Sequence, residues 1–172
     1  MPDAAVRNGR GQLLWLILSV LVVVLDQLSK LHFENALNLY QQIVVIPDLF
    51  SWTLAYNTGA AFSFLADGSG WQRWFFAAIA VVVSVVLVVW LKRLGRADTW
   101  LGIALALILG GALGNLYDRM VLGHVIDFVL VHWQNTWYFP AFNLADSAIT
   151  VGAVMLALDM FKSKKSEEAV HD

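Results

Sequence analysis

Two long runs of uncharged, mostly apolar residues limit what this chain can fold into. The run WFFAAIAVVVSVVLVVWL fills the 18 positions between Arg73 and Lys92, and TWLGIALALILGGALGNLY fills 19 more, from Thr99 to Tyr117. A helix of either length can cross about 30 Å of hydrocarbon. Because 59% of the residues are hydrophobic and only 14% are charged, the composition argues against a soluble domain and predicts a membrane protein.

Two weaker apolar runs bring the predicted membrane spans to four. The first begins near Leu13 and continues through Asp26 and Lys30. It also resembles a signal peptide, but DQLSK follows it where a cleavage site of small residues would be needed, so we predict a retained helix. We predict one integral membrane domain over residues 1–172, all-α apart from a small β element. The expected spans cover about 12–31, 73–92, 98–118 and 141–161.

The positions of the basic residues predict the orientation of these spans. Eight of the 11 Lys and Arg residues precede the first span, lie between the second and third spans, or follow the fourth. Basic residues near span ends resist translocation, so these eight should face the cytoplasm. Both termini are then cytoplasmic, and the long connection 32–70 is extracytoplasmic. The other three, Lys30, Arg73 and Arg119, lie at the opposite ends of spans.

The connection 32–70 has the composition of short strands. QQIVVIPDLFSWTLAYN is rich in β-branched and aromatic residues and is broken by Pro47-Asp48, and Asn57-Thr58-Gly59 is a second turn signal. We therefore predict a small sheet within about residues 40–65, with AAFSFL (60–65) lying on the membrane surface. The charged C-terminal residues 162–172 predict a disordered tail.

Several polar residues lie within the apolar runs. Asp26 and Lys30 are four residues apart on the first span, and we interpret them as a structural ion pair. The third span has a small residue at every fourth position: Gly102, Ala106, Gly110 and Gly114. This stripe predicts close packing of a neighbouring helix. The polar residues that follow, Asn115, Asp118 and Arg119, are interpreted as a structural cluster in which Arg119 could neutralise a nearby carboxylate.

His124, Asp127 and His132 are the residue types that bind zinc, but their spacing does not fit a metal site. In a strand, His124 and Asp127 point to opposite faces, and in a helix His132 lies far from His124. No HExxH-like pattern is present, and the chain has no cysteine to serve as a metal ligand, a nucleophile or a disulfide partner. The sequence therefore predicts no metal.

Asp127 and Asp146 are the two acids whose positions invite a chemical role. Asp127 follows the third span, and Asp146 lies three residues after Asn143, where the fourth span begins. Both are expected at the outer membrane face. An N-cap at Asn143 would explain Asp146 structurally, and the helix N-terminus also favours its ionised form. Asp127, between Ile126 and Phe128, should hold its proton more readily.

Two carboxylates with different proton affinities are suited to general acid/base hydrolysis, in which one deprotonates water and the other protonates or polarises a carbonyl. A small ion- or proton-coupled membrane transporter fits paired acids equally well on physical grounds, although no internal repeat is evident. A noncatalytic scaffold would explain the glycine stripe, but it leaves both aspartates unexplained.

Five short stretches, taken in order, resemble the bacterial lipoprotein signal peptidases, the signal peptidase II family. They are DQLSK (26–30), NTGAAF (57–62), GNLYDR (114–119), GHVIDF (123–128) and FNLADS (142–147). Each is short, but five in this order are specific, and the resemblance extends over residues 12 to 161. It implies a membrane aspartyl endopeptidase that removes the signal peptide from diacylglyceryl-modified prolipoproteins, immediately before the lipidated cysteine.

The resemblance also implies roles for individual residues. The catalytic pair would be Asp127 and Asp146, with Asp26 and Lys30 as supporting residues. Substrate-binding or site-supporting roles would fall to Asn57, Gly59, Asn115, Arg119 and Asn143. No metal or organic cofactor and no nucleic acid is expected. We expect a monomer in the bacterial cytoplasmic (inner) membrane, with its active site at the extracytoplasmic face and diacylated prolipoproteins and membrane lipids as partners.

Overall fold

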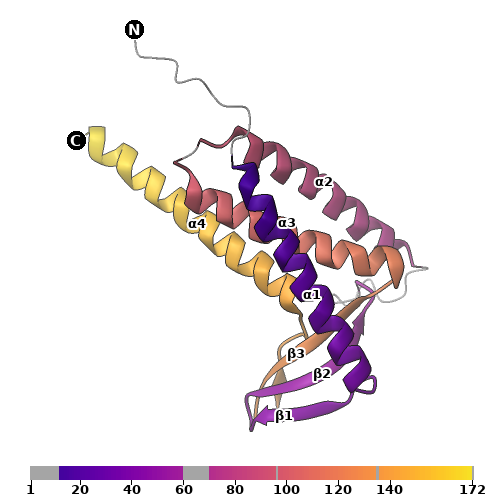
Figure 1. Ribbon diagram of the computed structural model, residues 1–172. Helices are drawn as coiled ribbons and strands as arrows, with labels where there is room; N and C mark the ends of the chain where they lie inside the picture. Colours follow the sequence, from indigo (N-terminus) through magenta and orange to yellow (C-terminus); the bar gives the residue numbers. More distant parts are fainter. Residues whose placement is uncertain (1–11, 60–69, 96, 135, 172) are drawn as a thin grey trace.

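The computed structural model describes residues 12–59, 70–95, 97–134 and 136–171. These residues form four long helices (Figure 1): α1 (Leu16–Ala36), α2 (Trp71–Arg93), α3 (Thr99–Val121) and α4 (Leu144–His171). A short 3-10 helix, η1 (Leu13–Trp15), leads into α1. The described strands are β1 (Gln42–Ile46), β2 (Phe50–Asn57), β3 (Val125–Trp133) and β4 (Trp137–Tyr138).

All four helices are long and apolar enough to cross a membrane, as the sequence predicts. Their bounds differ at two places. α1 continues to Ala36 rather than ending near residue 31. α4 continues to His171, so the expectation of a disordered tail is wrong for the backbone of residues 162–171. The tail is rich in Lys and Glu, which favour helix, and extending an existing helix avoids the cost of nucleating a new one.

α3 packs against each of the other three helices. Its glycine stripe lies against α1: a Cβ at Gly110 would be 2.7 Å from Val22 Cβ and 2.8 Å from the Ser19 carbonyl oxygen. A Cβ at Gly102 would meet the ring of Trp15, and one at Gly114 would meet the carboxylate of Asp26. The predicted close packing along this stripe is confirmed.

A second pair of glycines brings α4 against α3, which the stripe did not predict. A Cβ at Gly152 would lie 2.6 Å from the carbonyl oxygen of Ala104, and one at Gly111 would overlap the carbonyl group of Ala145. The backbones of the two helices therefore touch near the beginning of α4. This contact fixes the N-terminus of α4 beside the middle of α3.

The sheet is antiparallel with the strand order β1-β2-β3-β4. β1 and β2 form the predicted hairpin, and Asp48 in its turn has a φ of 63°. The prediction is incomplete, because β3 and β4 follow the third span and lie outside residues 40–65. The segment AAFSFL (60–65), expected on the membrane surface, lies outside the described residues.

The sheet is attached to the last turns of α1. Phe33 stacks on Phe128 of β3 with ring centroids 4.4 Å apart, and it also contacts Trp52 of β2 at 4.8 Å. Phe33 and Trp52 also pack against a buried apolar cluster formed by Leu37, Leu54 and Ile126. α1 therefore covers the sheet where β2 and β3 run side by side.

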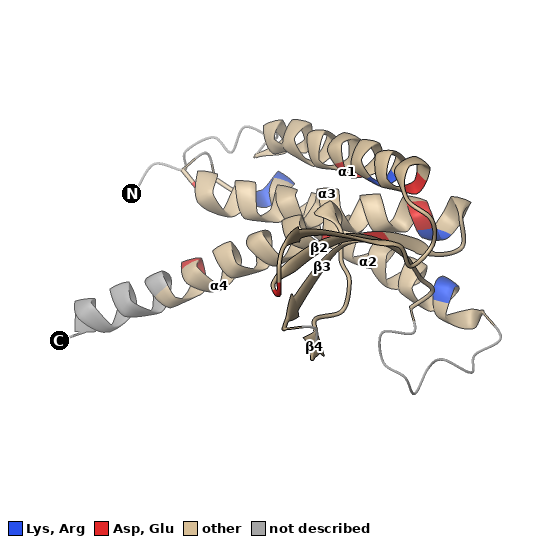
Figure 2. Cartoon of the chain, turned by 90° about the horizontal axis from the view of Figure 1, so that it is seen from below, with Lys and Arg blue, Asp and Glu red and all other residues tan. Residues whose placement is uncertain are grey.

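The start of α1 and the end of α4 lie at one end of the helices, and the sheet lies at the other (Figure 1). Seen from below, most of the length of the helices carries no Lys, Arg, Asp or Glu (Figure 2). Large apolar side chains such as Leu14, Val82 and Met160 are exposed along the helices. Surfaces of this kind suit contact with lipid rather than water.

Candidate active site

Asp127 is the third residue of β3 and lies opposite Ala55 of β2. Its side chain is buried, with 2% of the residue exposed. Asn57, at the end of β2, donates a hydrogen bond from Nδ2 to Asp127 Oδ2 at 3.1 Å. Asn143 donates from Nδ2 to Asp127 Oδ1 at 2.8 Å. Both carboxyl oxygens are therefore held by amide donors from other parts of the chain.

Asp146 is the third residue of α4, and Asn143 caps that helix. The Asp146 backbone N–H donates to Asn143 Oδ1 at 2.9 Å, and the Asn143 backbone N–H donates to Asp146 Oδ2 at 3.2 Å. This reciprocal pair is a capping box with Asp in place of Glu, and it confirms the predicted cap. Asn115 of α3 donates from Nδ2 to Asp146 Oδ1 at 2.7 Å.

A short return of the chain brings the two acids together. Phe142 pairs with Val129 of β3: the Phe142 N–H donates to the Val129 carbonyl at 3.0 Å, and the Val129 N–H donates to the Phe142 carbonyl at 2.9 Å. This pairing places Asn143 beside Asp127 before α4 begins. Asn143 is fully buried and contacts both carboxylates, so the chain returns on itself between residues 127 and 146.

Burial raises the pKa of Asp127 from an ordinary value of 3.8 to about 7. The negative charge of Asp146 acts in the same direction, whereas the hydrogen bonds from Asn57 and Asn143 and the charge of Lys30 favour the ionised form and oppose the rise. The direction agrees with the expectation that Asp127 holds its proton readily. Asp146 is only half-buried, so it is the more accessible of the two acids.

Two of the remaining predicted residues, Gly59 and Arg119, make no hydrogen bond or ion pair to either aspartate among the described residues. Gly59 donates its backbone N–H to Asn57 Oδ1 at 2.9 Å, and a Cβ there would be 2.8 Å from the Phe76 ring. Gly59 therefore supports Asn57 in a tight turn with a φ of 95°. Arg119 donates to the Asn115 carbonyl at 3.1 Å and lies over the Phe76 ring at 5.4 Å. Among the described residues it has no ion pair with either aspartate.

Asp26 and Lys30 form the predicted ion pair, at 2.7 Å between Asp26 Oδ2 and Lys30 Nζ. The sequence did not predict that Asp118 completes it, with Asp118 Oδ2 2.8 Å from the same Nζ. Asp118 lies three residues after Asn115, on nearly the same face of α3, and this spacing is the signal that could have placed it beside α1. The polar cluster expected after the third span is thus part of a larger network.

His124 and His132, the two histidines considered above as metal ligands, lie apart from this site. The His124 ring lies against the Tyr56 ring at 4.1 Å between centroids, and His132 Nε2 lies 3.1 Å from Ser51 Oγ. Within the described ranges, no group of three or more His, Asp or Glu residues is arranged to hold a metal ion.

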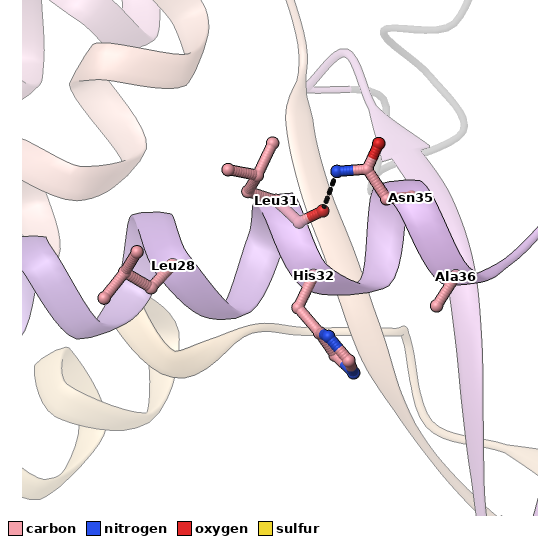
Figure 3. Close-up of a pocket in the computed structure, with 5 residues that line it drawn as sticks. All are labelled: Leu28, Leu31, His32, Asn35 and Ala36. Atoms are coloured by element: carbon pink, nitrogen blue, oxygen red, sulfur yellow. Dashed lines mark hydrogen bonds between the residues drawn. The ribbon is translucent and has the colours of Figure 1, made fainter.

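The open hollow drawn in Figure 3 is also separate from the aspartates. It lies on the C-terminal half of α1 and is lined by Leu28, Leu31, His32, Asn35 and Ala36. The Asn35 side-chain amide nitrogen donates a hydrogen bond to the Leu31 carbonyl of the same helix (Figure 3). The hollow therefore adds no chemical group to the pair formed by Asp127 and Asp146.

Comparison with known proteins identifies the family. Residues 18–162 match the family model described as Signal peptidase (SPase) II. The chain is 82% identical over 172 residues to a lipoprotein signal peptidase of Pseudomonas fluorescens, with all of both chains covered. It is 80% identical over 171 residues to a lipoprotein signal peptidase of Pseudomonas aeruginosa, with 99% of each covered.

Solved structures give the same result. A bacterial membrane enzyme solved at 2.3 Å resolution is similar to this chain with a TM-score of 0.78 at 30% sequence identity. The similarity covers 88% of this chain and 90% of that one. With four apolar helices and these relatives, the molecule is a multi-pass membrane protein. The chain belongs to the signal peptidase II family.

Proposed function

We propose that this protein is a membrane aspartyl endopeptidase that removes the signal peptide from diacylglyceryl-modified prolipoproteins, immediately before the lipidated cysteine. The proposal rests chiefly on Asn143, whose side chain binds one carboxylate and whose backbone binds the other. Membership of a peptidase family favours this reading over an ion-coupled transporter. The names of the relatives, which are lipoprotein signal peptidases, support the substrate class.

In this proposal, Asp146 is the general base and Asp127 the general acid. Asp146 accepts hydrogen bonds on both oxygens and lies at the N-terminus of α4, and both features stabilise its negative charge. It takes a proton from water as that water attacks the scissile carbonyl. Asp127 keeps its proton near neutral pH, because its pKa is raised to about 7, and gives it to the carbonyl oxygen or to the leaving amine.

The location of the pair suits a substrate anchored in lipid. Both acids lie where the helices meet the sheet, rather than at the middle of a span. A lipidated cysteine preceded by an apolar signal helix would hold its scissile bond at that depth. We further propose that the sheet is extracytoplasmic, that both termini are cytoplasmic and that the protein is a monomer of the bacterial inner membrane. The basic residues Lys92 and Arg93, at the end of α2 far from the sheet, support this orientation.

The test uses purified protein in lipid vesicles with two forms of one prolipoprotein. One form carries the diacylglyceryl group on its cysteine, and the other carries an unmodified cysteine. We expect a released signal peptide and a new N-terminal lipidated cysteine from the first form, and far slower cleavage of the second. No cleavage of the diacylated form by folded protein would refute the proposal, and equal cleavage of both forms would refute the substrate class.

A further inference from the structure

Three charged side chains are buried together between α1 and α3. Asp26 and Asp118 are fully buried, and Lys30 is 1% exposed. Lys30 Nζ lies 2.7 Å from Asp26 Oδ2, 2.8 Å from Asp118 Oδ2 and 2.9 Å from Asn115 Oδ1. An ammonium group has three N–H donors, so each can have its own acceptor here. Burying three charges is costly, and hydrophobic residues of similar volume often stabilise a fold as well or better.

Each acid of this triad also holds a backbone N–H beside one of the proposed catalytic aspartates. Asp26 Oδ1 accepts a hydrogen bond from the Ala145 N–H at 2.9 Å, one residue before Asp146. Asp118 Oδ2 accepts one from the Ile126 N–H at 3.3 Å, one residue before Asp127. Lys30 joins the two acids by ion pairs, and Gln27 of α1 also donates to both, so α1 links the backbone positions of both aspartates.

Lys30 also determines which way the Asn115 amide points. Because Asn115 Oδ1 accepts from Lys30 Nζ at 2.9 Å, the amide nitrogen is left to donate to Asp146 Oδ1 at 2.7 Å. A reversed amide would place its NH₂ group against the ammonium and its oxygen against the Asp146 carboxylate. Both contacts would then be repulsive. Lys30 therefore orients the Asn115 side chain so that its amide nitrogen donates to the Asp146 carboxylate.

We propose that Asp26, Lys30 and Asp118 form a positioning triad that sets the separation of Asp127 and Asp146. Asp26 holds the start of α4, Asp118 holds β3, and Lys30 fixes both acids relative to each other and orients Asn115. This inference rests on the proposed function, because it assigns the triad to the geometry of that reaction. None of the three residues touches the reacting atoms in this scheme.

The first test measures the positions directly, without any activity assay. Amide hydrogen exchange is followed in the folded full-length protein for the segments around Ile126 and Ala145. Asp26→Asn should speed exchange mainly around Ala145, and Asp118→Asn mainly around Ile126. Lys30→Met should speed exchange in both segments, because it removes the charged link between the two acids and leaves only the neutral bridge from Gln27 Nε2, which donates to Asp26 Oδ2 at 3.1 Å and to Asp118 Oδ1 at 2.8 Å. Unchanged exchange in all three folded variants would overturn the proposal, even if the protein proved not to be a peptidase.

The second test separates positioning from simple stabilisation of the α1–α3 contact. Ser19→Ala is the matched control, because Ser19 Oγ donates to the Ala106 carbonyl at 2.9 Å in the same contact, away from the aspartates. On a diacylated prolipoprotein, Asp26→Asn and Asp118→Asn should lower kcat by about 10- to 100-fold with KM nearly unchanged, as small misplacements of catalytic groups do. Ser19→Ala should lower the melting temperature while kcat stays near the wild-type value.

Two results of this second test count against the triad. If the Asn variants keep wild-type kcat, the triad does not position the aspartates. If kcat falls in Ser19→Ala as much as in the Asn variants at equal loss of stability, the triad only stabilises the fold. A wild-type protein that leaves the diacylated substrate uncut would instead refute the proposed function, while the exchange measurements would still decide the role of the triad.

Discussion

Asn143 Nδ2 lies 2.8 Å from Asp127 Oδ1, a contact between the residue that caps α4 and the third residue of β3. The same asparagine is hydrogen-bonded to Asp146 through its backbone N–H and its side-chain oxygen. A residue that would otherwise only cap a helix therefore also joins two acids from different elements. This residue therefore contacts both acids directly, whereas the proposed positioning triad acts on the backbone next to each of them.

Replacing either aspartate by asparagine should abolish cleavage without unfolding the protein. Asn is close to Asp in size and still forms hydrogen bonds, but it does not titrate in this pH range, so the base or the acid is lost. Asp127→Asn and Asp146→Asn should each reduce the rate of signal-peptide release by at least about 10³-fold while substrate binding survives. Asp48→Asn, the same change at an exposed hairpin turn, is the control and should keep full activity. Substantial turnover by either active-site variant would exclude the pair.

Chelation separates this mechanism from metal catalysis. Addition of EDTA should leave the rate of the wild-type protein unchanged, because the proposed reaction needs only the two carboxyl groups and water. The rate is measured on the same diacylated prolipoprotein after prolonged dialysis against the chelator. A rate that falls and is restored by a divalent cation would contradict the mechanism.

The pH dependence of cleavage follows from the raised pKa of Asp127. That pKa is about 7, so the acid carries its proton below this pH and loses it above. The rate should therefore fall as the pH rises through about 7, where Asp127 loses the proton that it gives to the substrate. The measurement is kcat/KM across the pH range in which the protein stays folded. A rate that keeps rising above pH 8 would contradict the assignment of Asp127 as the acid.

Asn57 provides a finer test of the same assignment. Its hydrogen bond to Asp127 Oδ2 favours the ionised form and lowers the pKa of that acid. Asn57→Ala removes this donor, so the pKa should rise further and the alkaline limb of the pH profile should move to higher pH. Asn35→Ala, which removes an exposed amide from α1, should leave the limb where it is. A shift to lower pH in Asn57→Ala would contradict the role of this hydrogen bond.

A large side chain at Gly110 should separate α1 from α3. A Cβ at this position already lies 2.7 Å from Val22 Cβ, so Gly110→Leu should destabilise the fold by about 1–3 kcal/mol or more and also lower activity. Thermal unfolding in detergent measures the loss. Val85→Leu, at an exposed position of α2, is the control and should unfold like the wild type. Unchanged thermal stability of Gly110→Leu would argue that the two helices do not touch here.

Reporter fusions test the orientation in the membrane. A reporter fused after Gly70, which precedes α2, should be extracytoplasmic, and one fused after Gly95, which follows α2, should be cytoplasmic. A paired set of reporters, each active on one side only, gives the answer for both positions. Detection of both fusions on the same side would show that α2 does not cross the membrane.

The sequence predicted the helices well because a helix that crosses the hydrocarbon of a membrane needs about 20 consecutive, mostly apolar residues, which are easy to find in a sequence. It predicted the β1–β2 hairpin from Pro47-Asp48 and its β-branched flanks. It missed β3, although VIDFVLVHW has the composition of a buried strand, because the run lies just after a span and its partner β2 is far away in sequence. Strand pairing across such a separation leaves little local signal.

The candidate site was predicted in part for similar reasons. Asn143 and Asp146 are three residues apart, so their capping contact could be read from spacing alone. The spacing of Asn115 and Asp118 indicates only that they share nearly one face of α3; Asp118 meets Lys30 because α1 approaches α3 closely at Gly114. Contacts between distant segments depend on packing, which the spacing of residues does not encode.

The hydrogen bond between Asp26 and the Ala145 N–H joins the first helix of the chain to the last. During synthesis, α1 leaves the ribosome long before α4, so Asp26 and Lys30 are in place while their partner is still unmade. A chain that lacks its fourth helix contains neither Asp146 nor the contact that holds it. In the proposed mechanism a partly synthesised molecule therefore lacks its general base, and cleavage begins only after the last helix has been made.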